Sequence, residues 1–235
     1  MTSATHRALT SADQTASVRT LGRLPLRLPL LAVMLYSGCG VKQRQAPVAR
    51  APEAAAVQPV GTDAAEVGGM RAVGTPAPVA DAALSAEFNN LFADGDIYFA
   101  GWPTEQGMRM LAARGVRTVI ALKTADQIQE ARGYDPRALA KALGINLVII
   151  PVRPDSFRPA DVDAFAAALD GSSGPVLVHC GSSNTVGGVW AAYLAGKRGL
   201  EVDKALEVGR AAGLKDGPMG DAAERVAGEV HATRE

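Results

Sequence analysis

The sequence predicts an α/β fold, a three-layer sandwich in which a mostly parallel sheet is flanked by helices. Short apolar runs alternate along the chain with segments that have the period of helices. The run VRTVIAL, residues 116–122, is typical of a strand that is buried on both faces of a parallel sheet. With 235 residues, of which 48% are hydrophobic, the chain is also long enough to bury one sizeable core.

The individual elements follow from local signals. A short strand at 97–101 leads to Thr104, a natural N-cap, and to a helix with Glu105 in its first turn. Asp135 followed by proline opens another helix, which ends at Gly144. Further strands are expected at 116–122, 147–150 and 176–178, and further helices at 160–170, 187–197, 202–212 and about 218–231. Because sites in such sheets lie at the carboxyl ends of the strands, the chemistry is expected there.

Charge and composition exclude several classes of function. Lys and Arg together number 24, as do Asp and Glu, so the formal net charge is zero. Aromatic residues make up only 5% of the chain, so neither a basic surface nor base-stacking platforms point to a nucleic acid partner. Two cysteines, Cys39 and Cys180, are too few for a disulfide framework. We predict no metal ion and no cofactor.

Residues 1–38 are predicted to be a signal peptide of the lipoprotein type. Arginines up to Arg27 supply positive charge, and the apolar stretch 28–36 is shorter than the about 20 residues needed to span a bilayer. Small residues then precede Cys39, which resembles a bacterial lipoprotein signal. The resemblance implies cleavage before Cys39, lipidation of its thiol and an exported, membrane-anchored protein that faces the periplasm or the cell exterior. An ordinary secretory signal and an uncleaved anchor are the alternatives.

Residues 39–83 are predicted to be a disordered tether. They are dominated by Ala, Val, Pro and Gly and show neither the period of a helix nor that of a strand. The folded domain is expected at 84–235, beginning near Leu84. A lipidated Cys39 would therefore hold this domain near a membrane without docking it there.

The stretch VLVHCGSSNTVGG, residues 176–188, is the strongest candidate for a functional site. Cys180 ends a strand and begins a turn into a helix, where backbone N–H groups converge and stabilise anions, including a thiolate. Only small residues follow it, so the loop amides can approach a ligand closely. His179 directly precedes the cysteine and could hold the turn through a ring hydrogen bond. The alternative is a structural cysteine that packs as a small apolar residue.

The run HCGSSNTVGGVWAAYLAGKRG resembles the signature of the cysteine-dependent protein tyrosine and dual-specificity phosphatase superfamily. The likeness is to the small bacterial branch that is also found in beta-lactamase-hydrolase-like proteins, and it covers roughly 88–215. It implies that Cys180 is the nucleophile that forms a phosphocysteine and that His179 supports the loop. The loop that would bind the anion comprises Gly181, Ser182, Ser183, Asn184, Thr185 and Val186.

The general acid is expected in the loop after the third of these strands, PVRPDSFRP. Asp155 is the best candidate to protonate the leaving oxygen. Asp161 and Asp163 are weaker candidates, because the first turn of a helix favours a carboxylate at Asp161 without any catalytic role.

Two departures from the family pattern affect the expected activity. Ser183 stands at the family's glycine position, so we expect a turn that needs positive φ to be remodelled. Thr185 stands at the arginine position and cannot clamp a phosphoryl group with two hydrogen bonds. Arg153 or Arg158 could reach the loop from the side, although solvated loop charges are the simpler interpretation.

Four functions remain open on these residues. The first is a phosphatase-like domain whose hydrolysis is weak or lost and which binds a phosphorylated or other anionic ligand. A genuine phosphatase that uses Arg153 or Arg158 is the second. The spacing from Cys180 to Thr185 is also similar to the loop of mercaptopyruvate sulfurtransferases, which suggests sulfurtransferase-like thiol chemistry as the third. A non-catalytic protein-binding module is the fourth.

Overall fold

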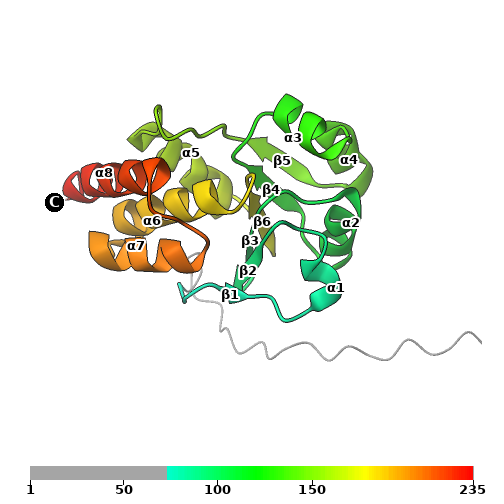
Figure 1. Cartoon of the computed structure of the whole chain (residues 1–235), viewed down its shortest axis with the longest axis horizontal. Helices are drawn as coiled ribbons and strands as arrows, with labels where there is room; N and C mark the ends of the chain where they lie inside the picture. Colours follow the sequence, from blue (N-terminus) through cyan, green and yellow to red (C-terminus); the bar gives the residue numbers. More distant parts are fainter. Residues whose placement is uncertain (1–72, 235) are drawn as a thin grey trace, which may run out of the picture. The chain divides into compact units, whose positions relative to one another are not determined.

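The computed structural model describes residues 73–234, which form a sheet between two layers of helices (Figure 1). The six strands lie in the order β1-β2-β3-β6-β4-β5. β3, β6, β4 and β5 are parallel, whereas β1 and β2 join the β3 edge in antiparallel pairing. The strands are β1 Ala77–Pro78, β2 Leu91–Asp94, β3 Ile97–Ala100, β4 Thr118–Ala121, β5 Asn146–Ile149 and β6 Val176–His179. The predicted sandwich with a mostly parallel sheet is confirmed.

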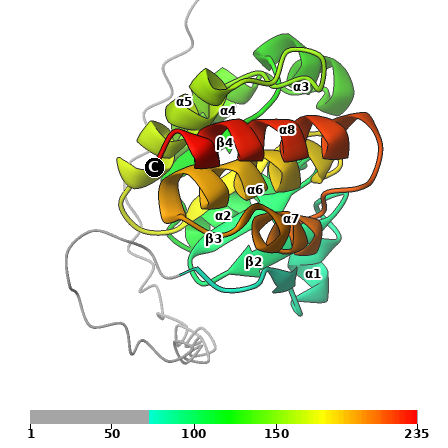
Figure 2. The same cartoon turned by 90° about the vertical axis from the view of Figure 1, so that its left-hand side faces the viewer.

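Helices cover both faces of the sheet (Figure 1). One layer holds α1 Ala82–Ser85, α2 Glu105–Ala113, α3 Ala125–Arg132 and α4 Pro136–Leu143, and the other holds α5 Pro159–Asp170, α6 Asn184–Arg198, α7 Val202–Ala211 and α8 Pro218–Ala232. Figure 2 shows α6 between α7 and α8 on its side of the sheet. Every residue of α6 from Thr185 to Gly196 is buried, so this helix is the centre of its layer.

The core has two parts, one on each face of the sheet. The larger part packs apolar residues of α5–α8 against alternate strand positions such as Phe99 and Val178. The smaller part packs α1, α2 and α4 against the other strand positions, such as Leu177. Since β6 lies between β3 and β4, its four residues are all buried. Cys180, the residue that follows β6, therefore lies at the end of a central, fully buried strand.

The structure corrects the sequence analysis at the N-terminal boundary and adds elements to it. β1 pairs with β2, and the Gly74 N–H donates to Asp94 Oδ2 at 2.7 Å. The fold thus includes residues 73–83, which the sequence analysis assigned to the tether, because this segment completes the edge of the sheet. Helix α3 was not predicted either. The signal peptide, Cys39 and the tether up to residue 72 lie outside the described residues.

The described residues contain no helix long and apolar enough to cross a lipid bilayer.

Candidate functional site

Cys180 is held in place by both strands that flank β6. Its N–H donates to the carbonyl of Ala100 at the end of β3, at 3.1 Å. The carbonyl of His179 accepts the N–H of Leu122, just after β4, at 2.9 Å. Cys180 is 1% exposed and carries a free thiol. The position that the sequence analysis assigned to the nucleophile is therefore fixed by the middle of the sheet.

The carbonyls of the next two residues are held by side chains from the segment before β2. Asn89 Nδ2 donates to the Gly181 carbonyl at 2.9 Å, and Asn90 Nδ2 donates to the Ser182 carbonyl at 3.0 Å. The Trp102 N–H also donates to the Gly181 carbonyl, at 3.2 Å. These bonds fix the orientation of the peptide groups in the loop. The two asparagines were not predicted, because they are about 90 residues away from the loop in sequence.

The N–H groups of the loop are left free to bind a ligand. Gly101 and Ser182 form an isolated antiparallel bridge, but among the described residues no hydrogen bond donated by the N–H groups of residues 181–186 is present. The last three belong to the first turn of α6, where the helix dipole adds partial positive charge. Unpaired amides that converge on a helix N-terminus favour an anion such as phosphate.

Ser183 keeps the backbone conformation that the sequence analysis expected to be lost. Its φ is 66°, the only positive φ of a non-glycine residue in the described chain. Such a conformation costs about 1 kcal/mol or more for a residue with a Cβ. The Ser183 hydroxyl compensates by donating to the Ala212 carbonyl at 2.7 Å inside the protein. The expectation of a remodelled turn was therefore wrong. Serine adopts the positive φ that glycine would adopt without strain, and its buried hydrogen bond to Ala212 offsets the cost.

The end of the loop is fastened to the segment between α7 and α8. Asn184 Oδ1 accepts the backbone N–H of Lys215 at 2.8 Å. Gly187, one turn into α6, packs so closely that an added Cβ would lie 2.4 Å from the Gly209 carbonyl oxygen and from the Leu214 nitrogen. The first turn of α6 is thus supported by backbone that is more than twenty residues further along the chain.

His179 is buried beneath the loop and uncharged. It is 2% exposed, and burial lowers its pKa to about 4, although an interaction with the Cys180 backbone opposes this shift. Its Nδ1 atom has no hydrogen-bond partner in the described part of the chain. The imidazole therefore contributes no positive charge at neutral pH and cannot offset the charge of a thiolate or of a bound anion.

The two arginines of the loop after β5, Arg153 and Arg158, both lie within ion-pair distance of a carboxylate. Arg153 donates to both carboxylate oxygens of Asp155, at 3.1 and 2.8 Å. This hydrogen bond lowers the pKa of the exposed Asp155 carboxyl, so the pair must open before Asp155 can act as a general acid. Arg158 Nε lies 4.0 Å from Asp161 Oδ1. The role of Asp155 stays a prediction.

The two weaker acid candidates have structural partners. Asp161 Oδ2 accepts the Arg158 N–H at the start of α5, at 3.1 Å. Asp163 forms an ion pair with Lys197 of α6, at 2.6 Å. Both carboxylates thus support helices. Thr185, which replaces the expected arginine, is 9% exposed and offers no charge.

A cavity of about 410 Å³ lies next to Trp102, and none of residues 180–186 lines it. Its lining combines Trp102, after β3, and Lys123, after β4, with residues of α3: Gln127, Glu130 and Ala131. The Trp102 indole is next to the loop, since a Cβ added to Gly181 would lie 3.4 Å from Trp102 Nε1. Neither Trp102 nor Lys123 was predicted as a site residue.

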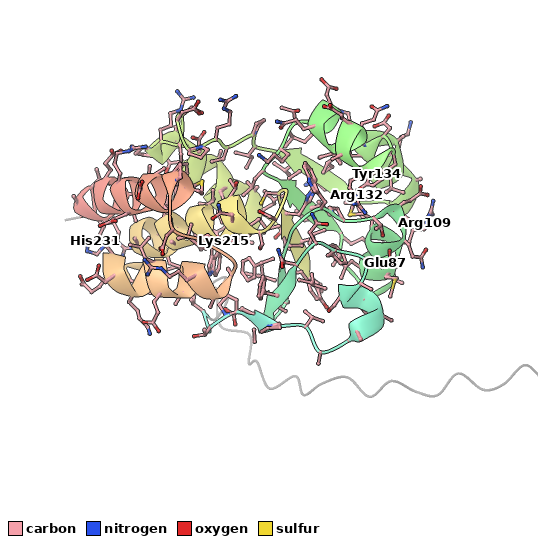
Figure 3. The ribbon with its side chains drawn as sticks, in the orientation of Figure 1. Glu87, Arg109, Arg132, Tyr134, Lys215 and His231 are labelled. Atoms are coloured by element: carbon pink, nitrogen blue, oxygen red, sulfur yellow. The ribbon has the colours of Figure 1, made fainter. Side chains whose placement is uncertain are left out.

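The segment that carries Trp102 is clamped in place. The carbonyl of Pro103 accepts Arg132 Nε at 3.0 Å and the Tyr134 hydroxyl at 3.3 Å, and Figure 3 shows these two side chains next to each other. The Thr104 hydroxyl donates to a carboxylate oxygen of Glu87. The backbone that follows Trp102 is therefore fixed on this side of the cavity.

Sequence comparisons place this chain near one protein family. Residues 102–197 match the family described as beta-lactamase hydrolase-like protein, phosphatase-like domain. The beta-lactamase hydrolase-like protein of Xylella fastidiosa (strain Temecula1) is 33% identical over 84 residues, which is 35% of this chain and 20% of that protein. The chain thus spans about a fifth of the length of the curated relatives that it matches.

Solved structures share the fold. A putative phosphatase from Shewanella putrefaciens CN-32 superposes with a TM-score of 0.52 at 24% identity, covering 66% of this chain and 97% of that one. TpbA of P. aeruginosa superposes with a TM-score of 0.50 at 22% identity, covering 68% of this chain and 95% of that one. A variant of TpbA, 21% identical, was solved in complex with pTyr. The resemblance predicted from the sequence is confirmed: this chain carries a domain of tyrosine phosphatase-like fold that is similar to the phosphatase-like domain of beta-lactamase hydrolase-like proteins.

Proposed function

We propose that the domain binds phosphate monoesters or similar anions at the cysteine loop, and that hydrolysis through a phosphocysteine at Cys180 is weak or lost. The observation that supports this proposal is the set of unpaired N–H groups of residues 181–186 around a buried thiol, with Thr185 where an arginine is expected. Amides alone can hold a phosphate dianion. Fast transfer of the phosphoryl group also needs a positioned cation for the charge of the transition state.

The reaction itself would proceed by attack of the Cys180 thiolate on phosphorus. The P–O bond to the leaving group breaks, and Asp155 would give that oxygen a proton once it is released from Arg153. Water then attacks the phosphocysteine and frees phosphate and the thiolate. Since His179 is neutral, the loop amides are the described groups that offset the charge of the thiolate.

Hydrolysis of p-nitrophenyl phosphate tests the catalytic part of this proposal. We expect the wild-type protein to turn over far more slowly than the about 1–1000 per second of typical enzymes, and Cys180→Ser to remove the remaining activity. Turnover in the typical range that disappears in Cys180→Ser would show that Thr185 does not impair the reaction. Persulfide formed on Cys180 with a sulfur donor, without any ester hydrolysis, would favour the sulfurtransferase-like alternative.

We also propose that the protein is exported and anchored to a membrane through a lipidated Cys39, facing the periplasm or the cell exterior. The support is the arrangement of arginines, a short apolar stretch and small residues before this cysteine. The full chain, expressed in a bacterium that processes lipoproteins, should enter the detergent phase on phase partitioning, and Cys39→Ala should move it to the aqueous phase. Equal partitioning of both proteins would contradict the lipid anchor.

A further inference from the structure

The cysteine loop has Thr185 where an arginine is expected, but a cationic residue, Lys123, lies near the base of the loop. Lys123 directly follows Leu122, whose N–H is bonded to the His179 carbonyl one residue before Cys180. Its backbone is therefore next to the base of the loop. The side chain is partly buried and lines the cavity that Trp102 shares.

Lys123 also differs from Arg153 and Arg158 in having no carboxylate partner. Arg153 is paired with Asp155, and Arg158 lies near Asp161, as described above. Within residues 73–234, no ion pair or side-chain hydrogen bond of Lys123 is present, although Glu130 lines the same cavity. A partly buried ammonium without a counter-ion interacts more strongly with an anion than a fully solvated one does.

Trp102 lies between the cavity and the loop. Trp102 connects the cavity to the loop, because its indole lies against Gly181, whose N–H is one of the unpaired amides. An anion on the loop amides would thus have its attached organic group on the Trp102 side, where Lys123 completes the wall. An aromatic face and a cation side by side suit a flat or apolar group that carries negative charge.

We propose that Lys123 supplies the positive charge that is missing because Thr185 stands where an arginine is expected. Its ammonium group would hold the anion of a phosphate monoester on the loop from the β4 side of the site. This inference rests on the proposed function, since it names the ligand contact of the same site. Lysine presents a compact point charge and not the bidentate fork of arginine. Lys123 would therefore stabilise the bound anion, but it would stabilise the transition state of phosphoryl transfer less well than an arginine.

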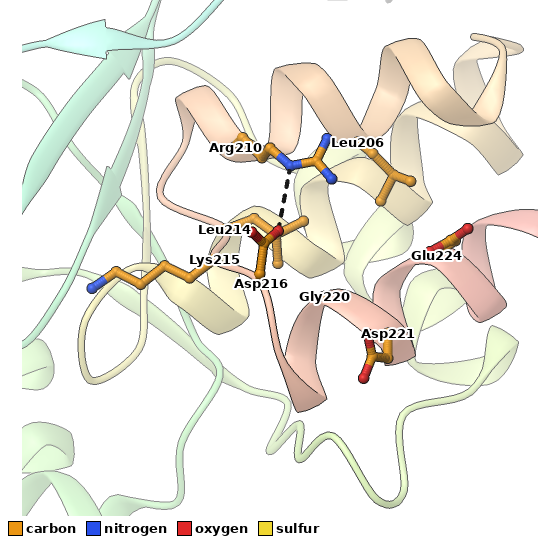
Figure 4. A pocket seen from close by; sticks show the side chains of 8 residues that line it. All are labelled: Leu206, Arg210, Leu214, Lys215, Asp216, Gly220, Asp221 and Glu224. Atoms are coloured by element: carbon orange, nitrogen blue, oxygen red, sulfur yellow. Dashed lines mark ion pairs between the residues drawn. The ribbon is translucent and has the colours of Figure 1, made fainter.

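Lys215 is the other lysine near the loop without a carboxylate partner, and it serves as the comparison. Its backbone N–H is bound by Asn184, but its side chain is exposed and lines a different cavity, of about 200 Å³, between α7 and α8. Figure 4 shows this side chain directed away from Asp221 and Glu224 of that cavity. Because it is more exposed than Lys123, its charge is screened more strongly by solvent.

The test measures the affinity of the protein for inorganic phosphate by isothermal titration at low salt. Lys123→Met should weaken binding by about 10-fold or more, the loss expected for a charge-assisted contact. Lys215→Met, and Lys141→Met on the exposed side of α4, should stay within about 2-fold of wild type by the same measure. Lys123→Arg should retain binding, and adding Thr185→Arg to Lys123→Met should restore it.

Each outcome separates this proposal from the one on which it rests. If folded Lys123→Met binds phosphate with wild-type affinity, the role of Lys123 is overturned and the anion site is not. The same holds if Lys215→Met loses more affinity for phosphate than Lys123→Met does. Absence of phosphate binding by the wild-type protein overturns both proposals. Circular dichroism and the thermal midpoint of each variant establish that it is folded, and Lys123→Arg controls for loss of the side chain's packing.

Discussion

Thr185→Arg is expected to raise the rate of p-nitrophenyl phosphate hydrolysis by roughly 10³-fold, the lower end of what a positioned arginine contributes in phosphoryl transfer. The remaining parts of the loop are in place: Cys180 is fixed by both neighbouring strands, and the amides of 181–186 are unpaired. Thr185 lies in the first turn of α6, at the position where the resemblance to the phosphatase superfamily implies an arginine. A guanidinium there would supply two hydrogen bonds to the phosphoryl oxygens during transfer.

The measurement is kcat/KM for wild type, Thr185→Arg and Thr185→Met. The methionine variant changes the size of the side chain without adding charge, so it should not gain activity. The double variant Thr185→Arg, Cys180→Ser should be inactive, which would show that the gain comes from the same nucleophile. A folded Thr185→Arg protein with unchanged activity would mean that the loss of arginine is not what limits this site.

Gly187→Ala is expected to destabilise the protein by about 3 kcal/mol, the upper range for overpacking a core. Its added Cβ would lie 2.4 Å from two backbone atoms, the Gly209 oxygen and the Leu214 nitrogen, and backbone cannot move aside as a flexible side chain can. The contact is reciprocal, since a Cβ on Gly209 would lie 2.6 Å from the Gly187 oxygen. Separating α6 from α7 would also strain the Ser183 hydrogen bond to Ala212.

Urea unfolding of Gly187→Ala and of a matched control, Gly228→Ala, measures this effect. Gly228 lies inside helix α8, and a Cβ there would meet nothing within 4 Å. Alanine at that position should therefore stabilise the protein by about 0.5–1 kcal/mol through its helix propensity. Equal stability of the two variants would contradict the close packing of α6 on α7 that supports the loop.

The parts of the fold that were predicted correctly carry their signals locally. The buried strands read as apolar runs, and Thr104 and Asp135 cap helices as expected. Helix α3 was missed because Ile128 is its only buried residue, which leaves little helical period. Its capping box between Thr124 and Gln127 was present in the sequence as the signal that could have identified it. β1 is a two-residue edge strand with little signal of its own, whereas β2 pairs with β3 through a two-residue turn, Gly95 and Asp96, which is a local signal of a hairpin.

In the candidate site too, residues that are consecutive in sequence could be predicted, and residues that only the fold brings together could not. The cysteine loop could be identified because the strand, the turn and the helix are consecutive in sequence. Trp102 and Lys123 could not, because they follow β3 and β4, and these strands flank β6 in an order that the sequence does not specify. The conformation of Ser183 is not predictable from the loop alone for a related reason: the carbonyl that accepts its hydroxyl belongs to Ala212, 29 residues away.

NMR of the ¹⁵N-labelled protein during titration with phosphate tests most directly whether the amides of residues 181–186 form an anion site. We predict saturable chemical shift changes that are largest at the N–H groups of these residues, since none of them has an acceptor in the described chain. Cys180→Ser, which keeps the backbone of the loop, should show the same pattern. Saturating phosphate that leaves these amides unshifted would contradict the claim.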